Sequence, residues 1–152
     1  MVPAGNYLDV LKQNTAKAIN KFKNIAPEKH NYAYAEGKWT IKEMLMHIID
    51  TERVMAYRAL VAARGDGKTQ LYSMDQNLYA QNVNVAKRTI DDMLEEFTAL
   101  RTATGKLFEN LTEEQSKQTA HVVNHHTTAR ALGYVIAGHV EHHINILNER
   151  YL

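Results

Sequence analysis

The sequence contains no cysteine, which excludes disulfide bonds, thiolate zinc sites and a cysteine nucleophile. Histidine and carboxylate side chains are therefore the strong metal ligands that remain to this chain. The lack of cysteine also fits a cytoplasmic protein, because reduced compartments do not favour disulfides.

Long hydrophobic runs are absent as well. No apolar stretch approaches the roughly 20 residues that a membrane-spanning helix needs, and the first six residues lack a basic start followed by an apolar run, so we expect no signal peptide. Charge of one sign is not in excess, since 18 basic residues face 17 acidic ones. We therefore expect a cytoplasmic protein with no membrane and no nucleic acid among its partners.

Glycine and proline are scarce, at 7 and 2 residues, so most of the chain can run as long helices. The chain has 152 residues and 45% of them are hydrophobic, which is enough to bury one core. We expect a single domain over residues 1–152.

Apolar residues recur at steps of three and four along four segments, which is the pattern of amphipathic helices. The expected helices cover about 8–25, 41–64, 89–111 and 128–151. The second has a capping box, Thr40 to Glu43, preceded by Trp39, which we expect to pack on Met44. The sequence thus predicts an all-α four-helix bundle.

Two connections are less regular. Residues 65–88 form a long link with a short helix near 77–81, and a link of this length is usually functional or wraps the bundle. Residues 116–127 are polar and show no strand alternation, so we expect a loop there. That loop carries His121, His125 and His126, which either cover a pocket or lie in solvent.

Three histidines fall on the inward faces of two expected helices. With about 100° per residue, His143 lies about 40° from His139, inside the apolar stripe of the last helix. His47 points inward from the second helix by the same count. A buried imidazole needs a partner, which could be a backbone carbonyl or hydroxyl, or a shared metal ion. Spacing i, i+4 brings two ring nitrogens together, and a three-histidine set leaves positions open for water or substrate.

Other site classes fit poorly. The segment His139–His143, HVEHH, matches neither H-E-x-x-H nor H-x-x-E-H. No Glu-x-x-His pair of the kind found in di-iron bundles is present. Neither a nucleophile elbow nor a phosphate-binding loop occurs.

The two histidine segments resemble those of a known family. Gly37–His47 (GKWTIKEMLMH) with the following IIDTERVMAYRAL, and Ile136–Leu147 (IAGHVEHHINIL), are similar to the DinB-like superfamily, as are Ala63–Asp66 (ARGD) and Asp75–Tyr79 (DQNLY). The resemblance covers nearly the whole chain, and the two histidine segments are specific as a pair.

This resemblance implies a DinB/YfiT-like bundle with an up-down-down-up order of helices, often as a homodimer. It also implies a divalent metal, zinc or nickel, on the residues matching His47, His139 and His143. Relatives of this family include S-transferases that use bacillithiol or mycothiol, a mycothiol-dependent maleylpyruvate isomerase, and many proteins described only as metal-dependent hydrolases. A low-molecular-weight thiol is thus a further cofactor to consider.

Two polar residues on the second helix are candidates for substrate binding. Arg58 lies about 20° from His47, three turns on, where it could bind an anionic group or form a salt bridge to a neighbouring helix. Thr51, one turn from His47, could orient a ligand or simply pack. An enzyme acting on a small-molecule substrate and a non-catalytic metal- or ligand-binding bundle both agree with these residues, and the sequence identifies no catalytic acid or base.

Overall fold

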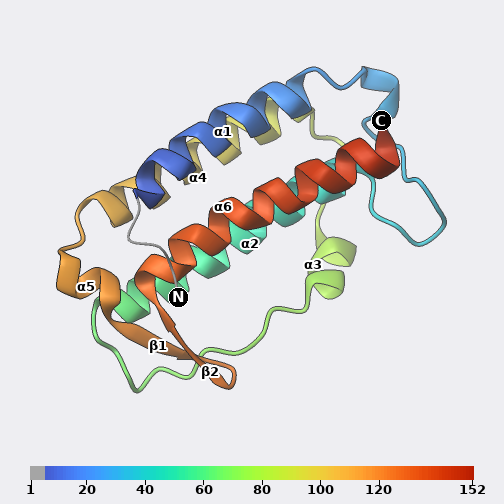
Figure 1. Ribbon diagram of the computed structural model, residues 1–152. Helices are drawn as coiled ribbons and strands as arrows, with labels where there is room; N and C mark the ends of the chain where they lie inside the picture. Colours follow the sequence, from blue (N-terminus) through green and yellow to red (C-terminus); the bar gives the residue numbers. More distant parts are fainter. Residues whose placement is uncertain (1–5) are drawn as a thin grey trace.

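The computed structural model describes residues 6–152 of the chain. Residues 1–5, to which much of the signal-peptide expectation refers, lie outside the described part. Four long helices form a bundle (Figure 1). They are α1 (Tyr7–Lys23), α2 (Ile41–Ala63), α4 (Ile90–Glu109) and α6 (Ala129–Ile146).

The helices run up, down, down and up. In Figure 1, α1 and α6 run in one direction while α2 and α4 run in the other. α2 packs against α6 and α4, and α1 packs against the same two helices. The parallel run of α2 and α4 requires a connection that returns along the length of the bundle, which explains the long link between them. The predicted all-α four-helix bundle is confirmed.

Short elements fill the connections. They are η1 (Pro27–Lys29), α3 (Gln76–Asn82), α5 (Glu113–Lys117), the strands β1 (Thr119–Val122) and β2 (His125–Thr128), and the closing π-helical turn η2 (Leu147–Tyr151).

No helix among residues 6–152 is both long and apolar enough to cross a membrane.

The expected polar loop over 116–127 is wrong. β1 and β2 pair antiparallel, with Val122 opposite His125, so that Val123 and Asn124 form a two-residue turn. The strands are four residues long and the turn lacks the Asn-Gly or Gly-X signal of a tight hairpin. The hairpin is stabilised by a tertiary contact that the local sequence does not reveal: Val122 also forms a β-bridge with Leu71 of the long connection.

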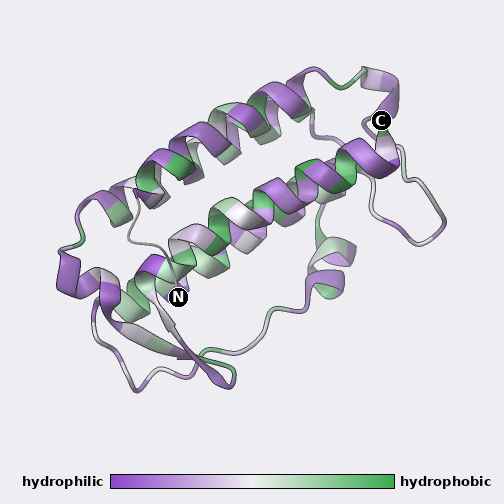
Figure 2. Cartoon of the chain, in the orientation of Figure 1, coloured by the Kyte–Doolittle hydropathy of each residue, from purple (hydrophilic) through white to green (hydrophobic). Residues whose placement is uncertain are grey.

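The core lies between the four long helices. Apolar and polar stretches alternate along each of them (Figure 2). Fully buried side chains come from every long helix and include Phe22, Met44, Ile48, Phe97 and Ile144. Burial of each such side chain contributes about 1.5–3 kcal/mol. Val135 of α6 is an exception among the apolar residues, since it is 43% exposed.

A charged pair is buried within this core. Arg101 of α4 donates to both carboxylate oxygens of Glu52 of α2 at 2.8–3.0 Å, and it also donates to the backbone carbonyl of Leu11 and to Asn14 and Thr15 of α1. The pair therefore ties three helices together. Helical periodicity does not reveal this pair, because single charged residues in an apolar stripe can also turn outward.

Candidate metal centre

The site begins with the local structure of α2. The Thr40 hydroxyl accepts the backbone N–H of Glu43, and the Glu43 carboxylate accepts the backbone N–H of Thr40, which completes the predicted capping box. This fixes the first turn of α2 and, one turn further on, the direction of His47. Trp39, just before the cap, packs on the ring of His47 with 4.5 Å between ring centroids.

Three imidazoles converge from two helices. The Nε2 atom of His139 lies 3.0 Å from that of His47 and 3.1 Å from that of His143. One nitrogen from each of the three rings lies within 4.8 Å of the others. Among residues 6–152, no other group of three histidine or carboxylate side chains comes this close.

All three rings lie in a poorly hydrated environment. His47 and His143 are buried, and His139 is half-buried. Loss of hydration disfavours the charged imidazolium and lowers the pKa of His47 and of His139 to about 4 and that of His143 to about 3. The neighbouring histidines add a smaller lowering effect. At neutral pH the three rings are neutral, which is the form that binds a metal ion.

The arrangement fits a divalent ion better than a set of hydrogen bonds. A neutral imidazole has one N–H and one lone pair, so each ring nitrogen is either a donor or an acceptor. The Nε2 atom of His139 therefore cannot form full hydrogen bonds to the Nε2 atoms of both His47 and His143. Two nitrogens bound to one tetrahedral zinc-like ion lie roughly 3.3 Å apart, close to the two short separations observed. That the histidines hold a metal stays a prediction.

Thr51 and Arg58 lie where the sequence predicted, on the same side of α2 as His47. The Thr51 hydroxyl is 3.5 Å from Nδ1 of His47, at the outer limit of a hydrogen bond. The Arg58 guanidinium is buried and donates to the backbone carbonyl of Tyr72 at 2.6 Å and to the sulfur of Met55. No salt bridge to Arg58 exists within the described residues, so the expected structural alternative of an interhelical ion pair is not found.

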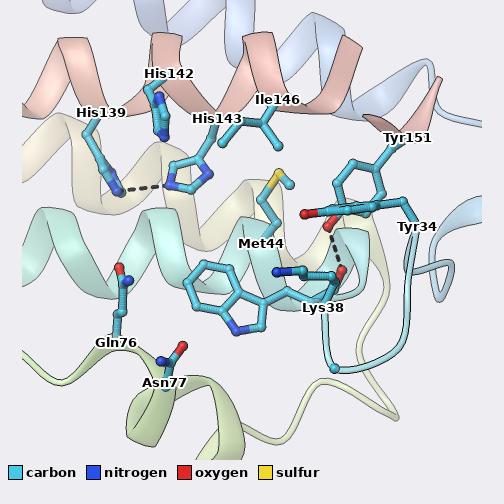
Figure 3. A pocket seen from close by; sticks show the side chains of 12 residues that line it. Tyr34, Lys38, Met44, Gln76, Asn77, His139, His142, His143, Ile146 and Tyr151 are labelled. Atoms are coloured by element: carbon cyan, nitrogen blue, oxygen red, sulfur yellow. Dashed lines mark hydrogen bonds between the residues drawn. The ribbon is translucent and has the colours of Figure 1, made fainter. Parts of the chain in front are cut away.

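Two cavities meet at the histidines. The larger, about 510 Å³, is bounded by His139 and His143 on one side and by Gln76 and Asn77 of α3 on the other (Figure 3). Its aromatic lining comes from Tyr34, Trp39 and Tyr151. The Tyr151 hydroxyl donates to the backbone carbonyl of Trp39 at 2.7 Å and closes the far end.

The smaller cavity, about 250 Å³, lies on the other side of His139. It is lined by His47, Thr51, Val54, Met55, Arg58, Ser73, Met74, Gln76, Val123 and His139. His139 and Gln76 border both cavities. Open space thus reaches the histidine cluster from two sides.

Other polar candidates lie away from the cluster. Asp50 pairs with Arg53 at 3.5 Å, and Glu141 accepts from Lys17. Glu141 therefore points away from the site. Tyr57 and Tyr79 are largely exposed.

The hairpin histidines do not cover either cavity. His121 and His126 stack on each other across the two strands, and His125 is exposed. The hairpin reaches the smaller cavity through Val123 at its tip instead.

Sequence reasoning missed Gln76 and the aromatic wall. Gln76 begins α3, where Asp75 caps the helix by accepting from the N–H groups of Asn77 and Leu78. The cap was visible in the sequence, but which side of the bundle α3 covers depends on the path of the long connection. Trp39 was expected on Met44; its ring packs on His47, and both Trp39 and Met44 line the larger cavity.

The family model of the DinB superfamily matches residues 10–147. The chain belongs to the DinB superfamily. This match contains both helices that carry the histidines and agrees with the resemblance seen in the sequence.

Individual relatives agree with this membership. A protein of Oceanobacillus iheyensis, named provisionally as a metal-dependent hydrolase, is 27% identical over 141 residues, which are 91% of this chain and 79% of that protein. YfiT from Bacillus subtilis, also provisionally described as a metal-dependent hydrolase and as having an unusual four-helix bundle topology, superimposes with a TM-score of 0.79 at 20% identity, covering 94% of this chain and 82% of YfiT.

A second solved structure shares the fold at greater distance. The mycothiol-dependent maleylpyruvate isomerase superimposes with a TM-score of 0.73 at 12% identity, over 94% of this chain and 60% of the isomerase. These likenesses between structures establish the bundle and not the reaction.

Proposed function

We propose that this DinB-superfamily protein is a metal-dependent enzyme that acts on a small molecule. The convergence of three neutral Nε2 atoms at the meeting point of two cavities carries the proposal. The name of the Oceanobacillus relative supports metal dependence. His47, His139 and His143 would hold the ion.

Zinc or nickel is the proposed metal, because both accept neutral imidazole. Such an ion supplies Lewis acidity, which activates a water or a thiol for attack on an electrophile. The three histidines keep the full positive charge of the ion because each donates only a neutral nitrogen. Trp39 covers His47 and limits the access of bulk water on that side.

Two further residues on α2 have proposed roles in binding. Thr51 holds the His47 ring through Nδ1, a positioning role that fixes which nitrogen faces the cluster. Arg58 binds an anionic group of the substrate, since its guanidinium faces the smaller cavity and has donors to spare beyond the Tyr72 carbonyl.

The proposed reaction is either hydrolysis or transfer of a low-molecular-weight thiol. The provisional hydrolase names of two relatives favour the first. The name of the mycothiol-dependent isomerase, together with the sequence resemblance to thiol transferases, favours the second. A small-molecule substrate and a homodimeric assembly, which the resemblance implies, complete the proposal.

Metal analysis of protein purified without a histidine tag tests the site. We expect close to one zinc or nickel ion per chain in the wild type and less than about a tenth of that in His143→Ala, because two imidazoles bind such an ion far more weakly than three. His142→Ala, one position away and exposed, is the matched control and should keep the metal. Equal metal content in both variants would contradict the proposed ligand set.

The same variant separates an enzyme from a non-catalytic metal-binding bundle. For an enzyme, His143→Ala should stay folded by circular dichroism and lose turnover of hydrolase substrates or thiol–electrophile pairs. For a structural site, loss of the metal should be accompanied by loss of the fold.

A further inference from the structure

Val123, at the tip of the hairpin, has a backbone conformation that a valine rarely adopts. Its φ is 55°, and it is the single residue other than glycine with a positive φ among residues 6–152. Of the two turn residues, Val123 has a positive φ and Asn124 does not. This is the pattern of a type II′ turn, which normally has glycine at the first turn position. A β-branched side chain in this region is strained.

The position of the Val123 side chain gives a reason for the strain. The residue lines the smaller cavity together with His47, Arg58 and His139. Glycine would satisfy the turn but leave that wall without a side chain. Backbone strain that persists beside a candidate site indicates that the side chain is needed there.

One short segment holds both Val123 and Arg58 at this cavity. The carbonyl of Leu71 accepts the N–H of Val123 at 2.8 Å, and the next carbonyl along the chain, that of Tyr72, accepts from Arg58 at 2.6 Å. The hairpin tip and the guanidinium are therefore placed relative to each other by two consecutive peptide units.

The smaller cavity favours an anion. Its lining contains Arg58 and no aspartate or glutamate, and Arg58 has no carboxylate partner within the described part of the chain. A buried guanidinium without a counter-ion is unfavourable, so an anionic group that enters gains a charge-assisted pair. A volume of about 250 Å³ is below the range of drug-sized pockets and suits a group of a few heavy atoms.

We infer that Val123 is a specificity-determining residue: it sets the size limit for a small carboxylate group that Arg58 anchors beside the histidine cluster. The inference rests on the proposed function, in that the carboxylate would belong to the substrate. It predicts that the turn is less stable than it could be, because the strained side chain is kept for selectivity.

Four variants test this, three in the turn and Arg58→Gln in the cavity. Val123→Gly removes both the strain and the side chain, Val123→Ala removes most of the side chain but keeps a Cβ at positive φ, and Asn124→Gly changes the neighbouring turn residue, which does not line the cavity. Melting temperatures are measured on metal-free protein. Binding of acetate and of the larger benzoate is measured by calorimetry, with and without metal.

We expect Val123→Gly to raise the melting temperature by roughly 2–4 °C, while Val123→Ala and Asn124→Gly do not. Both Val123 variants should improve the affinity for benzoate relative to acetate by about tenfold, and Asn124→Gly should leave the ratio unchanged. Arg58→Gln should weaken acetate binding at least tenfold.

The inference is overturned if the Val123 variants keep the wild-type ratio of affinities, if Val123→Gly lowers the melting temperature, or if the wild type binds neither carboxylate. Failure of the proposed function is distinguished by a different result, namely the absence of bound metal in the metal analysis. The melting temperatures and the carboxylate titrations of the metal-free protein still decide the role of Val123 in that case.

Discussion

At the scale of single residues, the histidine cluster makes the metal-free protein sensitive to acid. Unfolded, the three imidazoles take up protons near pH 6.5, whereas in the folded protein burial lowers the pKa of His47 and His139 to about 4 and that of His143 to about 3. Between these limits the unfolded chain binds more protons, so the free energy of unfolding falls as the pH drops. The stability is fully present above about pH 6.5 and is lost progressively down to pH 3–4.

Urea unfolding of the metal-free protein at pH 7.0 and 4.5 measures this effect. We expect a loss on the order of a few kcal/mol, and a smaller loss in His143→Ala. His125→Gln, which changes an exposed histidine of the hairpin, should lose as much as the wild type. A stability that stays constant over this interval would show that the rings are not desolvated as described.

At the scale of elements, the buried pair of Glu52 and Arg101 joins α2, α4 and α1 beside the core. Glu52→Gln leaves the Arg101 charge buried without its counter-ion, so we expect the free energy of unfolding to fall by about 3–5 kcal/mol. The double variant Glu52→Met, Arg101→Met should recover much of this loss. Chemical denaturation of the three proteins measures it.

Lys17→Ala is the control for this comparison. It removes a cross-helix pair with Glu141 whose side chains are 55% and 39% exposed, and such pairs contribute about 0–1 kcal/mol. If Glu52→Gln costs no more than Lys17→Ala, the buried pair does not hold the three helices together.

At the scale of the whole molecule, the proposed metal would link α2 to α6, two of the helices that pack along each other in the bundle. An ion that binds the folded state alone stabilises it by about 2.7 kcal/mol at a free concentration 100 times its dissociation constant. We expect the melting temperature to rise by roughly 5–10 °C under that condition. Differential scanning calorimetry of protein with and without added zinc or nickel measures the rise.

The same experiment addresses the single-domain prediction for residues 1–152, which calls for one cooperative transition with and without metal. His143→Ala should show the transition but little of the metal-dependent rise. A metal-induced rise of equal size in that variant would place the stabilising ion elsewhere.

Local sequence patterns specified the four helices and the direction of the histidine side chains. Helical periodicity depends on neighbours three and four residues apart, and so do the capping box at Thr40 and the inward positions of His47, His139 and His143. A rotation of about 100° per residue also placed Arg58 on the side of His47, because α2 is a regular helix from Ile41 to Ala63.

Tertiary structure alone decided how these parts meet. The hairpin forms because Leu71 of the long connection supplies partners for Val122 and Val123, and the burial of Glu52 depends on where α4 places Arg101. Gln76 borders both cavities only because the long connection lays α3 beside the cluster. Such contacts join residues far apart in the chain, and no local pattern encodes the distance between them.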